Sequence, residues 1–376
     1  MSLSNAREIN FEVLRVLIMF FIVIWHSLVH GLNFAGSLDI QSQIPVNYHS
    51  VISIFNYTTS SFLMTLTAVA VNIYILVTGY FMVNSGCKWN KIPYIWLQTA
   101  FYSFIITLII KITNAEDIGL KSLLFSGFPI FNNKYWFVTK YIGLITLAPF
   151  LSKFIQHISR KEYKVLLVIL FVLNIYLFPY FSYGNIYSSS DSLQLFIFLF
   201  LLGGYIRLYN PLTKYAKFFG RSFFLYCLFI TLAYIAKEYF LYITSHKTID
   251  VGISLTFLGN NSFTFFSAVL LFLWAKHRTF AKNRMTNFVV KVAPFTLGVY
   301  LIHDNEYIRK LLWEGLNLPT YFDSIMLLPM LIGISIIIFI ICIFLDYIRY
   351  KLFSFARIKD RLNAIMSRFE GVINIE

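Results

Sequence analysis

The chain has 376 residues, of which 58% are hydrophobic and 13% charged, and its formal net charge at pH 7 is +14. Soluble globular domains average about 45–50% apolar and about 25% charged residues, so a soluble chain of this length cannot bury so many large apolar side chains. The composition excludes soluble, disordered, collagen-like and disulfide-scaffold proteins, and it predicts an integral membrane protein.

Apolar stretches long enough to cross a bilayer recur along the whole chain. The first contains Glu12 and Arg15 and has no small-residue cleavage site behind it, so we expect a retained transmembrane helix and not a signal peptide. The ninth is short and opens near Pro294, so we expect it to be tilted, broken or partly buried in protein. The stretches lie at about 9–30, 62–83, 93–111, 138–155, 163–179, 192–208, 221–241, 259–275, 289–303 and 325–347.

These stretches predict an all-α integral membrane protein with about ten transmembrane helices. Residues 1–350 are expected to form the polytopic membrane domain, and residues 351–376 a basic cytoplasmic tail. The longest gap between spans, 31–61, is polar and aromatic and is expected to hold a short surface helix or a loop over the site.

The basic residues predict how the helices are oriented. If the N-terminus is cytoplasmic and the spans alternate, 22 of the 31 Lys and Arg residues fall inside, 8 fall outside and Arg15 lies within the first span. This asymmetry follows the positive-inside rule and also places the C-terminus in the cytoplasm. With the acidic residues counted, the net charge is +16 inside and −2 outside. The positive charge therefore indicates topology and attraction to anionic lipids of the inner leaflet, and no nucleic acid is expected as a partner.

One face of the first span is polar along its length. At about 100° per residue, the side chains of Glu12, Arg15, His26 and His30 fall within one arc of about 60°. Arg15 lies about 16 Å from His26 along the helix, nearer the cytoplasm. Such residues are costly inside a bilayer and usually face the bundle interior.

This arrangement has two interpretations. An arginine near the inside suits the phosphates of a cytosolic cofactor, and a histidine in the outer half suits proton transfer or nucleophilic attack. Alternatively, Arg15 extends to the inner headgroups and His26 only bonds a neighbouring helix.

A second candidate group ends the ninth span. His303 falls at the outer membrane boundary beside Asp304, where the pair could orient a sugar hydroxyl or support His26. The spacing fits equally well a His303 that only makes structural hydrogen bonds at the membrane interface and has no functional role. His26 and His30 lack a carboxylate or cysteine nearby as a further ligand, so no metal is expected. Trp136, near the outer face, could stack on a sugar ring.

Taken in order, these residues resemble the membrane-bound acyltransferase 3 family. Arg15 and His26, behind the run Asn10-Phe11-Glu12, match the family's Arg-x10-His signature. The likeness covers nearly the whole chain, and the family's usual core has about ten spans with both ends inside. Further similar runs follow in the expected order, at Tyr74–Phe81, Lys88–Pro93, Tyr135–Phe137 with Lys140 and Tyr141, Gly204–Arg207 and Gly298–His303.

The resemblance implies transfer of an acyl group, usually acetyl from acetyl-CoA, to a hydroxyl of a surface polysaccharide or lipid-linked glycan at a bacterial plasma membrane. It implies that Arg15 and His26 are the essential pair, with His26 as general base or acyl carrier. Many members carry arginines where this chain has Lys88 and Lys91. On this reading the candidate residues are Glu12, Arg15, His26 and His303 for catalysis, Arg15, Lys88 and Lys91 for the coenzyme phosphates, and His30, Trp136 and Asp304 for the acceptor.

Two other functions fit part of the pattern. A polysaccharide transporter or flippase would also have many spans, charge within the membrane and abundant aromatic residues. The concentration of polar residues on the first helix and the lack of an internal repeat stand against it. A structural scaffold in a polysaccharide-synthesis complex would tolerate substitution of Arg15 and His26.

Overall fold

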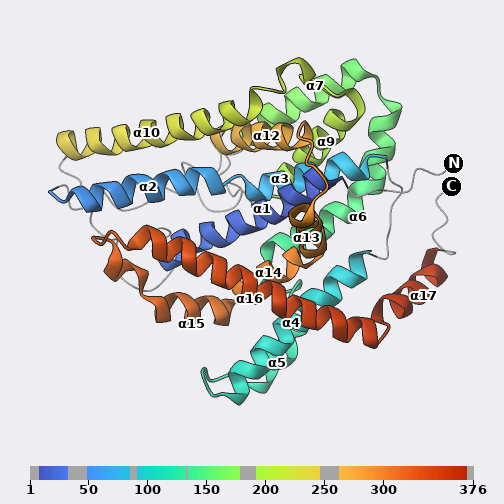
Figure 1. Cartoon of the computed structure of the whole chain (residues 1–376). Coiled ribbons are helices and arrows are strands. Elements are labelled where there is room, and N and C mark those ends of the chain that lie inside the picture. The colour runs from blue at the N-terminus through green and yellow to red at the C-terminus, as the bar shows by residue number, and fades with distance from the viewer. Residues whose placement is uncertain are drawn as a thin grey trace.

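The structure, a computed structural model, describes residues 8–32, 49–84, 91–132, 134–177, 192–245 and 262–370. Within these ranges the chain is a bundle of helices without strands (Figure 1). The α-helices are α1 Ile9–His26, α2 Val51–Thr67, α3 Ala70–Met82, α4 Lys91–Ile112, α5 Leu120–Ser126, α6 Trp136–His157, α7 Arg160–Phe171, α9 Leu193–Tyr209, α10 Phe219–Ser245, α12 Ser262–Lys276, α13 Arg284–Val292, α14 Thr296–His303, α15 Glu306–Leu316, α16 Leu327–Phe355 and α17 Ile358–Glu370.

Among the described residues, seven helical segments are long and apolar enough to cross a membrane, and two shorter apolar helices, α9 and α12, pack among them. An α-helical, multi-pass membrane protein, as predicted from composition, is thus confirmed. About ten spans, cytoplasmic termini and a domain boundary after residue 350 stay predictions. The seven segments are Ile9–Gly31, Val51–Met82, Lys91–Ile112, Trp136–His157, Phe219–Thr244, Arg284–His303 and Leu327–Phe355.

The second span begins at Val51, well before the predicted start at 62. Ser50 caps α2 because its hydroxyl accepts a hydrogen bond from the Ser53 N–H at 3.2 Å. Asn56 is buried, and its amide donates to the carbonyls of Phe322 and Ser324. Hydropathy misses the first turns of α2 because they carry buried polar side chains such as Asn56. Residues 33–48 of the predicted 31–61 loop lie outside the described residues.

The ninth span is broken at Pro294, as predicted. α13 ends at Val292, a 3₁₀ turn covers Ala293–Phe295, and α14 continues from Thr296. Proline lacks the N–H that a continuous α-helix needs at this position, so the α-helical hydrogen-bond pattern is interrupted before the chain reaches His303.

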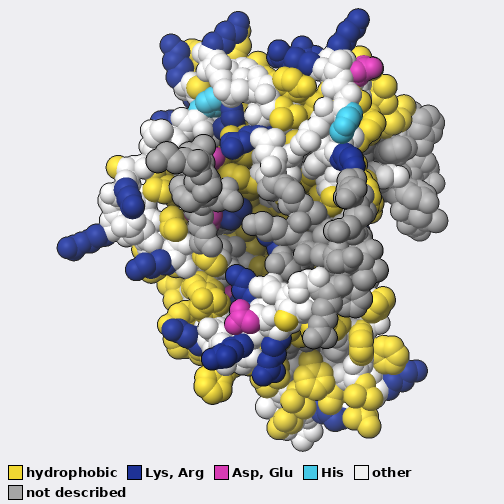
Figure 2. All heavy atoms as spheres, turned by 90° about the vertical axis from the view of Figure 1, so that its right-hand side faces the viewer, with side chains coloured by type: hydrophobic (Ala, Val, Ile, Leu, Met, Phe, Trp, Pro, Cys, Tyr) yellow, Lys and Arg dark blue, Asp and Glu magenta, His cyan; other side chains and the backbone are white. Residues whose placement is uncertain are grey.

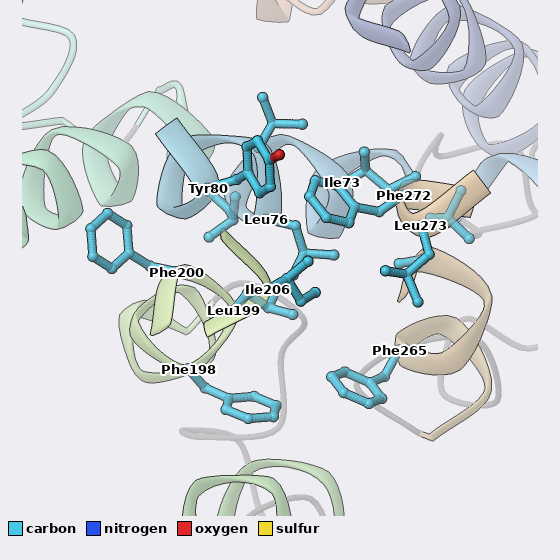
Figure 3. Close-up of a cluster of buried hydrophobic side chains, with 14 of the residues drawn as sticks. Ile73, Leu76, Tyr80, Phe198, Leu199, Phe200, Ile206, Phe265, Phe272 and Leu273 are labelled. Atoms are coloured by element: carbon cyan, nitrogen blue, oxygen red, sulfur yellow. The ribbon is translucent and has the colours of Figure 1, made fainter. Parts of the chain in front are cut away.

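α3 and α9 approach each other closely through two glycines. A Cβ added at Gly79 would lie 2.0 Å from the carbonyl oxygen of Phe200, and one at Gly203 would lie 2.2 Å from that of Leu76. Small residues allow such backbone contact between helices within a membrane. Figure 3 shows the core beside this crossing, where side chains of α3, α9 and α12 meet. α1 packs against α2, α3 and α16 and so lies inside the bundle, where its polar face meets other helices.

Candidate active site

The polar face of α1 ends in a π-helical turn. Directly after His26 the helix widens into the turn Ser27–Gly31, which carries His30. The Ser27 hydroxyl donates to the Val23 carbonyl and lies 2.9 Å from that of Ser335 on α16. π-turns inside helices are frequent at functional sites, because the extra residue re-aims the side chains around it.

His26 contacts the end of α14 directly. Its Nδ1 lies 2.9 Å from Nε2 of His303, and Nδ1 of His303 lies within hydrogen-bond distance of the Val299 carbonyl. His303 is buried, with 1% of its surface exposed, whereas the side chain of His26 is 13% exposed. His303 is therefore placed to orient the His26 ring through a hydrogen bond at Nδ1 of His26.

Asp304, which follows α14, adds a carboxylate to the two histidines. Its Oδ1 lies 3.6 Å from Nδ1 of His26, 4.0 Å from Nε2 of His30 and 3.5 Å from Nη1 of Arg309. Burial raises the pKa of this carboxyl above its ordinary value, and the neighbouring histidines and Arg309 oppose the rise. Arg309 thus balances a buried negative charge beside His26.

A cavity of about 530 Å³, here called the histidine cavity, opens in front of His26. Trp136 lines it from α6, with the Lys140 ammonium 5.3 Å from the Trp136 ring centre. The remaining polar lining includes His30, Asn72, Tyr141, Thr296, Tyr300, Asp304 and Arg309. An aromatic wall with several hydroxyl and amide groups suits a hydroxyl-rich ligand.

A second cavity of about 540 Å³, here called the basic cavity, lies toward the end of the bundle where α1 begins and α16 ends (Figure 1). Its cationic lining residues are Arg15, Lys91, Arg349 and Lys359. Both cavities share the lining residues Tyr74, Ile95, Tyr141 and Thr296. The two cavities therefore adjoin along these four residues.

Arg349 is held at the basic cavity by a buried ion pair. Its Nε and Nη2 donate to the two carboxylate oxygens of Asp346 at 2.8 and 3.0 Å, and its Nη1 donates to the Tyr94 hydroxyl at 3.0 Å. Tyr102 and Gln98 on α4 donate to Asp346 as well. A Cβ on Gly298 would lie 2.2 Å from Cγ of Asp346, so α14 can pass the pair only with glycine there.

A comparison with known protein families identifies the family to which the chain belongs. The family model described as acyltransferase domain matches residues 8–347. The chain belongs to the acyltransferase 3 family. It is therefore an acyltransferase, as the resemblance implied. No curated protein matches it, and no solved structure does.

For this acyltransferase 3 protein, the structure brings together most of the residues singled out in the sequence. His26, His30, His303 and Asp304 form one cluster, and Trp136 lines the histidine cavity together with His26, His30 and Asp304. Arg15 and Lys91 both line the basic cavity. Lys88 lies outside the described residues.

Glu12 does not join the histidines. It is buried and pairs with Arg15 at 3.0 Å, near the start of α1, and it lines neither cavity. It shares a helix face with His26 but lies several turns away, so its contact is with Arg15.

Arg309 and Arg349 were missed as site residues. Both appeared in the sequence only as charges that contribute to topology. The sequence did contain a signal for Arg349, because Asp346 and Arg349 are spaced i, i+3 at the end of an apolar stretch. In such a stretch, pairing the two opposite charges lowers the free-energy cost of burying them.

The fold brings a carboxylate close to His26 and His30. Asp304 supplies the carboxylate that His26 and His30 lack in the sequence, and one ligand atom of each lies within 4.8 Å of the others. Arg309 also neutralises this carboxylate, and Nδ1 of His26 already lies at hydrogen-bond distance from His303. The absence of a metal requirement stays a prediction.

Proposed function

We propose that this acyltransferase transfers an acetyl group from cytosolic acetyl-CoA to a hydroxyl of an extracytoplasmic polysaccharide or lipid-linked glycan. The observation that carries the proposal is the pairing of His26, in an aromatic and polar cavity, with a basic cavity that shares four lining residues with it. His26 acts as the general base on the acceptor hydroxyl.

The charge distribution supports a cytosolic donor. Figure 2 shows the face at which α1 begins and α16 ends, with Lys and Arg side chains spread over it and few Asp or Glu side chains. The positive-inside rule places such a face in the cytoplasm, at a bacterial plasma membrane with anionic inner-leaflet lipids. The basic cavity opens at this end, where a cytosolic polyanion arrives and is attracted.

The donor is held by the cations of the basic cavity. Arg15, positioned by Glu12, and Arg349, positioned by Asp346, present guanidinium groups that suit phosphate oxygens. Lys91 lines the same cavity, and Lys88 of the same basic turn is expected to act with it. The pantetheine arm then extends past Tyr74 and Tyr141 and brings the thioester to His26.

The hydrogen bonds behind His26 determine which of its nitrogens is the base. A carbonyl only accepts, so His303 donates its Nδ1–H to Val299 and its Nε2 has a lone pair. That lone pair accepts the Nδ1–H of His26 at 2.9 Å. Nε2 of His26 is therefore unprotonated and serves the reaction in the histidine cavity.

The chemistry follows from this tautomer. The acceptor hydroxyl gives its proton to Nε2 of His26 as its oxygen attacks the thioester carbonyl carbon. The carbon–sulfur bond breaks, the acetyl ester remains on the acceptor, and the leaving thiolate takes the proton from His26. Asp304, 3.6 Å from Nδ1, stabilises the transient imidazolium. His30, Trp136 and Arg309 line the space for the acceptor.

The role of His303 is tested by two substitutions of similar size. In His303→Gln the amide can donate to the Val299 carbonyl and accept from His26, whereas His303→Leu can do neither. His303→Leu is expected to lower kcat by about 100-fold with an unchanged KM for acetyl-CoA, and His303→Gln to retain kcat within about tenfold of the wild type. Steady-state kinetics measure both, with thermal unfolding as the control for folding. Equal losses in the two variants would contradict the hydrogen-bond role.

The proposed function itself predicts thioester chemistry that depends on an acceptor. Purified protein in lipid nanodiscs, given radiolabelled acetyl-CoA, should release free thiol and label a glycan fraction from a bacterial envelope, and a chelator should leave the rate unchanged. The matched control omits the glycan. Movement of labelled glycan across proteoliposomes without thiol release would show a transporter and overturn the proposal.

A further inference from the structure

α17 borders the basic cavity although it lies beyond the region that matches the family. That region ends at residue 347, whereas α17 covers Ile358–Glu370. Lys359, Leu362 and Asn363 line the cavity together with residues of α1, α3, α4 and α16. Their i, i+3, i+4 spacing places them on one face of α17, so the helix presents a wall to the cavity.

The chain reaches this position through a tight reversal after α16. Ala356 ends the helix by donating its N–H to the Leu352 carbonyl, and Arg357 has a left-handed backbone with φ of 49°. α17 then packs against both α16 and α4, which border the cavity. Because α17 begins directly after this reversal, Lys359 in its first turn is held close to the end of α16 that carries Arg349.

The charged residues that line the basic cavity favour an anionic ligand beside α17. The residues that line the basic cavity include no Asp or Glu. Arg15 and Arg349 have partial charge compensation from Glu12 and Asp346, whereas Lys359 forms no ion pair within the described ranges. A lysine in such a lining acts as a point charge for phosphate oxygens.

We propose that α17 forms one wall of the donor site and that Lys359 binds a phosphate group of the coenzyme A portion. This inference rests on the proposed function, and it extends the donor site into a segment outside the matched region. The site is completed by the C-terminal segment, so the tail of this chain serves binding as well as topology.

The test compares two single substitutions on the same helix. Lys359→Ala and Arg361→Ala each remove one positive charge from an exposed position, but Arg361 lines neither cavity. Isothermal titration of the purified full-length chain with coenzyme A should show a Kd about tenfold higher for Lys359→Ala, which corresponds to about 1.4 kcal/mol. Arg361→Ala should remain within about twofold of the wild type, because only long-range attraction is lost.

A second measurement does not depend on charge. A cysteine introduced by Asn363→Cys should react with a water-soluble maleimide, and saturating acetyl-CoA, which has no free thiol to consume the reagent, should slow that reaction. Equal Kd values for Lys359→Ala and Arg361→Ala, or no protection at position 363, would overturn the role of α17 while leaving the proposed function intact. Failure of the wild type to bind coenzyme A would instead overturn both.

Discussion

His26→Ala is expected to lower acetyl transfer by about 10³-fold, because it removes the proposed general base. Coenzyme A binding should be unchanged, since His26 lines the histidine cavity and not the basic cavity. The measurement is thiol release with acceptor present, together with titration of coenzyme A in the same preparation. A variant that loses transfer while it keeps donor affinity separates the chemical step from donor binding.

The matched control is His30→Ala. His30 lines the same cavity and approaches Asp304 at 4.0 Å, whereas His26 is the residue whose Nδ1 lies 2.9 Å from Nε2 of His303. Its loss is expected to raise the KM for the acceptor about tenfold, with a smaller effect on kcat. Transfer retained by His26→Ala, or a greater loss in His30→Ala, would refute the assignment of His26 as the base.

The helical part of the fold and one face of the site could be predicted because both depend on residues close in sequence. Spanning helices follow from stretches of apolar residues, and the shared face of His26 and His30 follows from the helical repeat. The break at Pro294 is also local. The same repeat grouped Glu12 with the histidines, but distance along the helix separates them, and Glu12 contacts Arg15 instead.

The remainder of the site depends on how distant helices pack. Nothing in the spacing of His26 and His303 requires their rings to meet, because that contact needs α14 to end beside the π-turn of α1. Asp304, whose carboxylate lies near both His26 and His30, directly follows α14, so its position depends on the same packing. The early start of α2 was hidden because Asn56 is polar, and the carbonyls of Phe322 and Ser324 that accept from its amide lie far along the chain.

Asp346→Ala is expected to destabilise the protein by about 3–5 kcal/mol. The substitution leaves the Arg349 guanidinium, 3% exposed, without its carboxylate partner. It also deprives Tyr102 and Gln98 of their acceptor. Thermal unfolding in detergent, followed by intrinsic fluorescence, measures the loss. An unchanged unfolding temperature would contradict the conclusion that this pair is buried and coupled.

The double variant Asp346→Leu with Arg349→Met separates folding from binding. Replacing both partners of a buried pair with apolar residues of similar volume removes the uncompensated charge, so most of the lost stability should return. Coenzyme A should nevertheless bind about tenfold more weakly than to the wild type, because a guanidinium that lines the basic cavity is gone. Restored stability together with wild-type affinity would show that Arg349 has a structural role and does not bind coenzyme A. Restored stability with weakened affinity would show why a charged pair is kept at this depth, since the apolar alternative folds but does not hold the donor.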